Sequence, residues 1–336
     1  MIHFLGSHFF RGLRIGLLTA APLLAQLPEP NGGLLQPGTL PDHWITGGPK
    51  CMEVPEFQIH EYNPDFYILR ESGCTHYEKP FLYLLFGEDR ALLLDTGAGK
   101  THVGRIVSEL IEKWNLRNQR ESIPLIVSHL HSHGDHTSGD PQFADIPNTT
   151  LVAPDLDAVK QFYGFTTFAS EMVEYDLGNR VLDVIGIPGH DAASIAIYDR
   201  QTGVLLTSDT VYPGRIYVRE PEALKQSIHT LAEFARTHPI AYVLGTHIEQ
   251  TATPYLEYAI GSIYQPNEHP LQLSRANLFE FDEALQGMDD VVRYAMPSLT
   301  IFPTSPEVSQ KMNEVRKATE TAQRARMWNQ KASGGE

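Results

Sequence analysis

Short apolar runs separated by turn-forming residues characterise the chain after about residue 60. Runs at residues 66–69, 81–86 and 91–95 predict three β-strands, because short stretches rich in aliphatic and aromatic residues are typical of strands. Residues 87–89 (Gly-Glu-Asp) predict a hairpin turn between the last two. The segment 91–94 is continuously apolar, which indicates a strand that is covered on both faces.

Helical periodicity appears in two segments of this region. Residues 103–114 form one apolar face with Val103, Ile106, Val107, Leu110, Ile111 and Trp114. Residues 221–236 carry a similar stripe formed by Leu224, Ile228, Leu231 and Ala235. Further strands are predicted at residues 123–127, 150–153, 181–187, 194–198, 204–207 and 241–244. Strands and helices mix without strict alternation, so we expect an α/β fold of the mixed α+β kind, with sheets between helical layers.

The two ends of the chain have a different character. Residues 26–50 are rich in Pro and Gly, which predicts a linker. We expect one catalytic domain over residues 51–260 and a C-terminal helical extension over 261–336 that packs on the same domain. Within the extension, the pattern predicts a polar loop, a helix, a short strand and a charged final helix at residues 264–270, 275–287, 297–302 and 306–330.

The N-terminus is typical of an export signal. Residues 1–14 contain Arg11 and Arg14 and no acidic residue, and residues 15–25 form a short apolar run. We expect a signal peptide over residues 1–25, cleaved after Ala25, and a periplasmic or secreted protein. The alternative is an uncleaved N-terminal anchor, although the run is shorter than the ~20 residues that span a bilayer.

Composition and charge narrow the possible partners. The chain is 42% hydrophobic and 20% charged, as expected of a globular protein. It has 26 basic and 41 acidic residues and a net charge of −15. Such a surface repels phosphate backbones and anionic lipids, so we expect a small-molecule substrate, no nucleic acid, and no stable membrane association after signal cleavage. The oligomeric state stays open.

The chain has two cysteines, Cys51 and Cys74. In an exported protein they can form a disulfide that ties the N-terminal segment to the first sheet. Two free thiols are an equal alternative, because the sequence does not supply the distance between them.

The segment His131-Ser132-His133-Gly134-Asp135-His136 directly follows a predicted buried strand. It places four metal-ligand side chains within six residues, and imidazole and carboxylate groups suit a divalent ion such as zinc. Residues i and i+2 of an extended segment point the same way, so His131 and His133 can bind one metal while Asp135 and His136 turn toward a second. Further ligand types follow other predicted strands, at His190, Asp209 and His247.

This ordered series resembles the ligand pattern of the metallo-β-lactamase-fold superfamily, and Leu94-Asp95-Thr96-Gly97 resembles a turn found upstream in its members. The similarity covers roughly residues 55–250 and implies a four-layer αββα sandwich. It also implies a first metal site formed by His131, His133 and His190, and a second formed by Asp135, His136 and His247. Asp209 would bridge the two, and Asp95 would support the site from behind.

The resemblance implies a metal-dependent hydrolase with two zinc ions, or other divalent ions such as manganese or iron, that share a hydroxide. Asp135 is expected to transfer a proton to the leaving group. Tyr212 resembles a tyrosine of lactonases that binds or protonates near the substrate oxygen. Arg215 is a weaker candidate for binding a substrate carboxylate, with a solvated role favoured, and Glu268 and His269 are candidates for the mouth of the site.

The substrate stays open among acyl and related compounds. An ester or lactone fits the full ligand set and Tyr212 best. A β-lactam is the alternative substrate. Asp209 argues against it, because the β-lactamases of this fold generally lack a bridging aspartate. A glyoxalase-II-like thioesterase or a mono-iron dioxygenase of the same fold are further alternatives, although the seven candidate ligands argue against the latter. Loops at residues 165–172, 212–219 and 264–273 carry aromatic residues that suggest an apolar pocket: Phe165, Phe168, Tyr217 and Tyr264.

Overall fold

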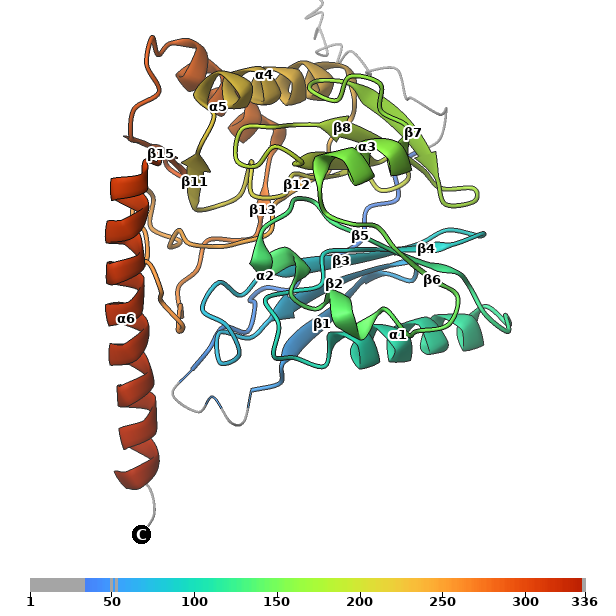
Figure 1. The fold of residues 1–336 in the computed structure, drawn as a ribbon, viewed down its shortest axis with the longest axis horizontal. Coiled ribbons are helices and arrows are strands. Elements are labelled where there is room, and N and C mark those ends of the chain that lie inside the picture. The colour runs from blue at the N-terminus through green and yellow to red at the C-terminus, as the bar shows by residue number, and fades with distance from the viewer. Residues whose placement is uncertain (1–33, 49–50, 52–53, 334–336) are drawn as a thin grey trace, which may run out of the picture.

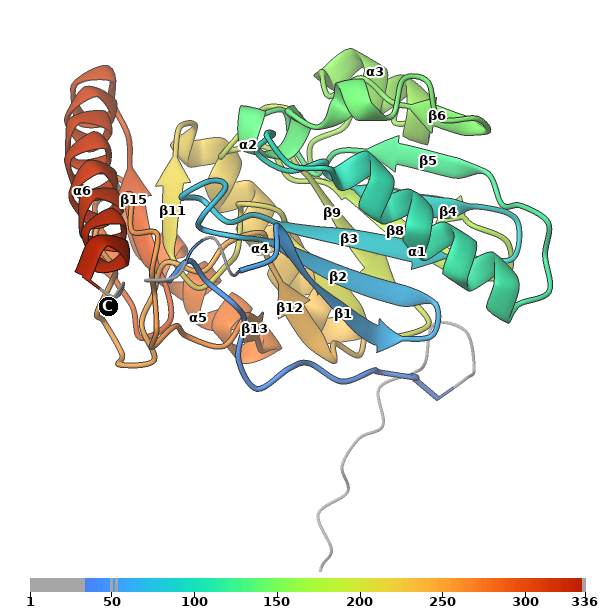
Figure 2. The ribbon, with the colours of Figure 1, turned by 90° about the horizontal axis from the view of Figure 1, so that it is seen from below.

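The computed structural model describes residues 34–48, 51 and 54–333, and leaves the side chains of 327–333 undescribed. The predicted signal peptide, and residues 26–33 and 49–50 of the predicted linker, lie outside the described residues. Two six-stranded sheets face one another across a core (Figures 1 and 2). Within the described part of the chain, no helix has the length and apolar character needed to span a membrane.

The first sheet has the strand order β1-β2-β3-β4-β5-β6. Its strands are β1 (Phe57–Asn63), β2 (Phe66–Glu71), β3 (Phe81–Phe86), β4 (Ala91–Leu94), β5 (Leu125–Ser128) and β6 (Thr149–Leu151). Strands β1 to β4 are antiparallel neighbours, whereas β4, β5 and β6 run parallel. The predicted strand at 91–95 ends at Leu94 because Asp95 adopts a φ of +69° and leaves the sheet.

The second sheet has the order β13-β12-β10-β9-β8-β7. It consists of β7 (Met172–Asp176), β8 (Val181–Gly186), β9 (Ile195–Asp199), β10 (Val204–Leu206), β12 (Tyr242–Leu244) and β13 (Gln272–Leu273). A small third sheet joins β11 (Arg215–Val218), β15 (Thr300–Pro303) and β14 (Tyr294–Ala295). The sequence analysis did not predict strands β1, β7, β11, β13 and β14. Strand β7, for example, lies at a sheet edge and is only partly buried.

Helices cover the outer faces of both sheets. The apolar stripe of α1 (Val103–Arg117) packs on the first sheet, and α4 (Pro221–Thr237) and α5 (Arg275–Gln286) pack on the second. Together with the core between the sheets, this gives the predicted four-layer αββα sandwich (Figure 1). The short helices α2 (Gly134–Thr137) and α3 (Leu156–Tyr163) and a 3₁₀ turn at Asp140–Gln142 follow β5 and β6.

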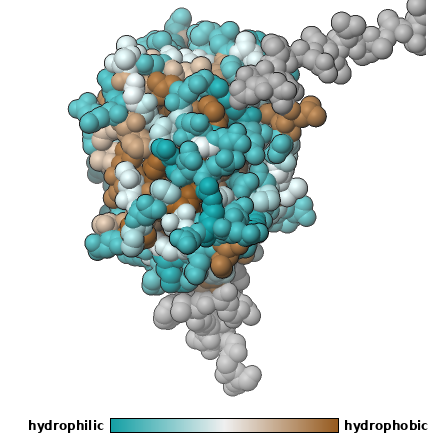
Figure 3. All heavy atoms as spheres, turned by 90° about the vertical axis from the view of Figure 1, so that its right-hand side faces the viewer, coloured by the Kyte–Doolittle hydropathy of each residue, from teal (hydrophilic) through white to brown (hydrophobic). Residues whose placement is uncertain are grey.

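The C-terminal segment contributes strands as well as helices, and β15 corresponds to the short strand predicted at residues 297–302. Strand β13 extends the second sheet and β15 pairs with β11, so residues after 260 complete the sheets as well as adding α5 and the long helix α6 (Pro306–Ser333). Helix α6 stands beside the sandwich and projects past it (Figure 1). The face in Figure 3 is mostly polar, with apolar side chains in scattered groups.

Cys51 and Cys74 form a disulfide, with their Cα atoms 5.3 Å apart. The bridge ties the segment before β1 to the loop after β2, which confirms the first of the two alternatives. That loop leads directly into the residues that form one wall of the site described below.

Candidate metal centre

The predicted ligands follow four strands whose ends meet at one edge of the sandwich. His131 follows β5, His190 follows β8, Asp209 follows β10 and His247 follows β12. Strands β10 and β12 run parallel, with Leu206 opposite Leu244. Asp209 and His247 follow these two residues at the same distance along the chain, so the strand register brings them side by side. This register places residues far apart in sequence within one cluster.

The structure divides the seven side chains into two groups that share Asp209. The first group contains His131, His133, His190 and Asp209, and the second contains Asp135, His136, Asp209 and His247. Within each group the candidate ligand atoms all lie within 4.8 Å of one another. The grouping agrees with the assignment that the family resemblance implied.

Asp209 lies between the two groups, with one oxygen toward each. Its Oδ2 is 3.6 Å from His131 Nε2 and 3.5 Å from His190 Nε2. Its Oδ1 is 3.7 Å from His136 Nε2 and 3.3 Å from His247 Nε2. Thr246 donates a hydrogen bond to Oδ1 and holds the carboxylate in this orientation.

Hydrogen bonds behind the cluster orient its imidazole rings. His190 Nδ1 lies 3.0 Å from the carbonyl oxygen of Tyr217, and His247 Nδ1 lies 3.0 Å from that of Glu78. A carbonyl only accepts, so both rings must carry their proton on Nδ1. This leaves the Nε2 lone pair facing the centre, which is the arrangement found around metal-binding histidines.

Asp95 plays the same role for His136. Its Oδ2 lies 2.8 Å from His136 Nδ1, and its Oδ1 accepts a hydrogen bond from the backbone N–H of Leu130 at 2.8 Å. The predicted supporting position behind the site is therefore where the structure places it. His129 instead pairs with Asp140 at 2.9 Å and belongs to neither of the two ligand groups.

The donor set fits a divalent cation. His133 Nδ1 lies 2.9 Å from His131 Nε2 and 3.1 Å from His190 Nε2, so three ring nitrogens converge. The buried Nε2 of His136 has no hydrogen-bond partner among the described residues. Lone pairs and carboxylates that face one another in a buried space repel unless a positive charge lies between them.

Burial and neighbouring charges shift the protonation of the two groups in different ways. Burial lowers the pKa of His131 and His190, and lowers that of His133 to about 4, so these rings are neutral and able to bind a metal. Burial also opposes a charge on His136 and His247, but the adjacent carboxylates outweigh it and raise their pKa. The second group thus requires a positive charge, which a metal ion supplies.

Tyr212 lies beside the cluster, with its ring centroid 5.6 Å from that of His247. Its hydroxyl donates to the carbonyl of Arg215 and lies 3.1 Å from Glu249 Oε2. The proposed catalytic role of this phenol stays a prediction, and it requires the hydroxyl to leave these partners.

Arg215 is buried, whereas the sequence analysis expects either a solvated side chain or one that binds a substrate carboxylate. Its guanidinium bonds to Glu249 at 2.8 Å and to Glu257 at 2.7 Å. It is therefore neither solvated nor free for a substrate carboxylate. Glu249 also accepts a hydrogen bond from Tyr217 at 3.2 Å, so this buried network supports the wall below the cluster.

Glu268 and His269 do not line the mouth of the site. The carboxylate of Glu268 accepts two hydrogen bonds from the buried guanidinium of Arg70, and the one from Nη2 to Oε1 is 2.6 Å long. Both residues border a separate hollow near residues 40–47, which Tyr264 also lines. Phe165 and Phe168 lie in the core between the sheets, so of the four aromatic residues only Tyr217 lines the metal-site cavity.

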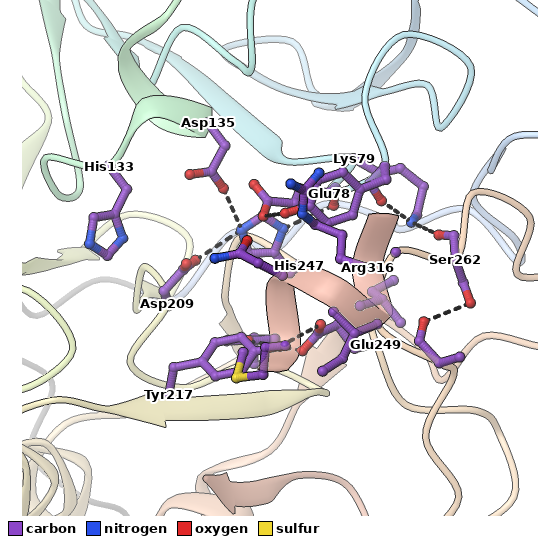
Figure 4. A pocket seen from close by; sticks show the side chains of 18 of the residues that line it. Glu78, Lys79, His133, Asp135, Asp209, Tyr217, His247, Glu249, Ser262 and Arg316 are labelled. Carbon is purple, nitrogen blue, oxygen red and sulfur yellow. Dashed lines mark hydrogen bonds and ion pairs between the residues drawn. The ribbon is translucent and has the colours of Figure 1, made fainter. Parts of the chain in front are cut away.

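A cavity of about 250 Å³ opens onto the cluster (Figure 4). His133, Asp135, His190, Asp209 and His247 form its floor. Its walls include residues that the sequence patterns did not indicate: Tyr77, Glu78 and Lys79 from the loop after β2, residues 259–262, and Ser309, Met312, Asn313 and Arg316 from α6. No periodicity or motif marks these residues, because they meet only in the folded chain.

The sequence profile of the metallo-beta-lactamase superfamily matches residues 80–247. This segment contains all seven clustered ligands and most of both large sheets. The chain therefore belongs to the metallo-beta-lactamase superfamily, and the family, the fold and the His/Asp cluster together define a metal-dependent hydrolase.

Three named proteins illustrate what this chain is similar to. The chain is 25% identical over 196 residues to the bovine (Bos taurus) acyl-coenzyme A thioesterase MBLAC2, a match that covers 49% of this chain and 70% of that protein. It is 29% identical over 123 residues to a hydroxyacylglutathione hydrolase of Pectobacterium atrosepticum, a match that covers 35% of this chain and 47% of the relative. A solved metallo-beta-lactamase from Pontibacter korlensis aligns with 69% of this chain and 100% of its own, at 15% identity and a TM-score of 0.46.

Proposed function

We propose that this chain is a dizinc hydrolase that cleaves an acyl bond of a small molecule, an ester or a lactone in the first instance. The position of Asp209, with one carboxylate oxygen toward each histidine group, supports two metal ions rather than one. When bound, such a pair supplies a water molecule that is activated near neutral pH and a Lewis acid for the substrate oxygen. Zinc suits the mixed imidazole and carboxylate donors, and manganese or iron are the alternatives.

Asp135 is the residue best placed to move a proton. Its Oδ2 lies 3.2 Å from the Nε2 atoms of both His136 and His247, and its side chain also borders the cavity. It therefore contacts the second metal group and any ligand that enters. We propose that this carboxylate accepts the proton of the attacking water and passes it to the leaving group.

A thioester is the second candidate substrate. Two groups of relatives bear names that describe the hydrolysis of acyl groups from a thiol-containing carrier, coenzyme A or glutathione. The superfamily supports many reactions on one fold, so the cavity rather than the fold must select the carrier. A β-lactam remains the alternative against which Asp209 counts.

We further propose that the chain is exported. The Cys51–Cys74 disulfide supports this proposal, because such bonds persist mainly in oxidising compartments. Fractionation of cells that express the full chain, with N-terminal sequencing of the product, tests it. Recovery of the uncleaved chain in the cytosol with reduced cysteines would contradict export.

The test of function joins metal analysis to a substrate panel. The protein is assayed on an aryl ester, an acyl-homoserine lactone, a thioester and a cephalosporin, with and without a chelator. We expect about two zinc ions per chain, chelator-sensitive acyl hydrolysis, and loss of both in Asp209→Ala. The control Asp145→Ala removes an exposed carboxylate away from the cluster and should change neither. One iron per chain and no hydrolysis would point instead to the dioxygenase.

A further inference from the structure

Helix α6 forms one wall of the metal-site cavity, although it lies outside the family-matched segment. Its cavity-lining residues are Ser309, Met312, Asn313 and Arg316. Their spacing of three or four positions puts them on one face of the helix, over two turns. The cavity is thus bounded by an element that the superfamily match does not include.

Several contacts hold this face of α6 against the cavity. Further along the same face, Gln323 Oε1 accepts a hydrogen bond from the backbone N–H of Ile263 at 2.6 Å. Gly261 has a φ of +87°, and a Cβ atom there would lie 2.5 Å from the carbonyl oxygen of Arg316. This close approach fixes the helix at the turn that carries Arg316.

Arg316 directs its charge toward the side of the cavity near the second metal group. Its guanidinium carbon lies 5.0 Å from the ring centroid of Tyr77. Arg316 and Glu78 both line the cavity (Figure 4). Its ion pair with Glu320 spans 3.5 Å and is partly exposed, so it is weak. The guanidinium keeps donors that a ligand can use.

Arg219 provides a second positive charge in the same cavity, just after β11. Its side chain is exposed, and among the residues whose side chains the structure describes (34–48, 51 and 54–326) its guanidinium makes no hydrogen bond or ion pair. The chain has 41 acidic and 26 basic residues, so most of its cations have carboxylates to pair with, and this one does not. The third cation of the cavity, Lys79, is already bound to the carbonyl oxygens of Tyr77 and Ser262.

The cavity therefore contains two arginines with unused hydrogen-bonding capacity beside the metal ligands. We propose that it selects acyl substrates that carry a carboxylate or a phosphate, and that Arg316 and Arg219 bind this anion. A guanidinium matches the geometry of either group through paired hydrogen bonds. This inference rests on the proposed acyl hydrolase function and names the substrate class of the same site.

The experiment separates binding from turnover. Metal-loaded protein is titrated calorimetrically with 4-acetamidobenzoate, with its neutral methyl ester, and with 4-acetamidophenyl phosphate. The corresponding acetoxy esters are then assayed for hydrolysis. The variants are Arg316→Ala, Arg316→Gln and Arg219→Ala, and Lys317→Ala is the matched control, because Lys317 is an exposed neighbour on α6 that does not line the cavity.

We expect at least one anionic amide to bind about tenfold or more tightly than the neutral one, as expected for hydrogen bonds to a charged group. Arg316→Ala and Arg316→Gln should remove most of this preference, Arg219→Ala part of it, and Lys317→Ala none. The relative affinity for the carboxylate and the phosphate identifies the anion.

Equal binding of charged and neutral amides would overturn the inference. So would an anion preference that survives in both arginine variants, because the metal ions would then be its source. A failure of the acetoxy esters to be hydrolysed would count against the proposed function alone, since the binding titration does not depend on turnover.

Discussion

Replacing Asp95 with asparagine is predicted to weaken the second metal group selectively. Asp95 and His136 are both fully buried and meet at 2.8 Å. In the variant Asp95→Asn, the amide oxygen can keep the hydrogen bond from Leu130, but the amide nitrogen then faces His136 Nδ1 as a donor. The ring must accept there, so its proton moves to Nε2 and blocks the nitrogen that faces the metal cluster.

The expected loss of zinc affinity follows from the loss of the hydrogen bond by which Asp95 orients His136. Such losses lower metal affinity by about tenfold to a hundredfold. This corresponds to about 1.4–2.8 kcal/mol of binding free energy. The first group should keep its affinity, because the two oxygens of Asp95 bond to Leu130 and His136 and not to its three histidines.

Competition with a chromophoric zinc chelator measures the two affinities. The matched control is Asp140→Asn, which makes the same change beside His129, a histidine outside the metal cluster. Asp95→Asn should release one zinc at a lower chelator concentration, and Asp140→Asn should not. Unchanged affinity of Asp95→Asn, in a variant that folds normally, would refute the assigned role of this hydrogen bond.

Three further predictions concern the surroundings of the site. Replacing both Cys51 and Cys74 with alanine opens a loop of 23 positions and should lower the unfolding free energy by about 3 kcal/mol in urea titrations; a change below about 1 kcal/mol would contradict the entropic estimate. Burial raises the pKa of Glu71 from 4.5 to about 7, so its ionisation in the folded state costs stability above about pH 7 but not below pH 4.5. Glu71→Gln should therefore be more stable than the native chain by up to about 3 kcal/mol at pH 8 and similar to it at pH 4.5, and an equal difference at both pH values would refute this. Gly261→Ala should cost about 1 kcal/mol or more and expose α6 to limited proteolysis, because the new Cβ meets the carbonyl of Arg316; unchanged cleavage would show that α6 adapts.

The strand and ligand patterns were sufficient to predict most of the fold and the cluster. A continuously apolar run such as Leu92–Leu94 can only be stable when it is covered on both faces, which is a local property of the sequence. The close spacing of His131, His133 and Asp135 likewise indicates metal binding before any folding is considered. Strand β7 was missed because an edge strand buries little and leaves a weak pattern.

The roles of single charged side chains were harder to predict. The sequence analysis favours a solvated Arg215 and places Glu268 at the mouth of the site. Each is instead paired with a residue that is distant in sequence, Glu249 and Arg70 respectively. Whether a charge is free or paired depends on which partner the fold brings within about 3 Å, and no local pattern encodes that partner.

The sequence by itself determined the class of fold and the set of candidate metal ligands, because apolar periodicity and clustered donor groups are local properties. Only the tertiary structure decided how Asp209 divides its two oxygens between the histidine groups and whether Cys51 and Cys74 are joined. It also decided that α6 closes the cavity with Arg316. These features depend on contacts between segments far apart in the chain, and such contacts exist only once the sheets have paired and packed.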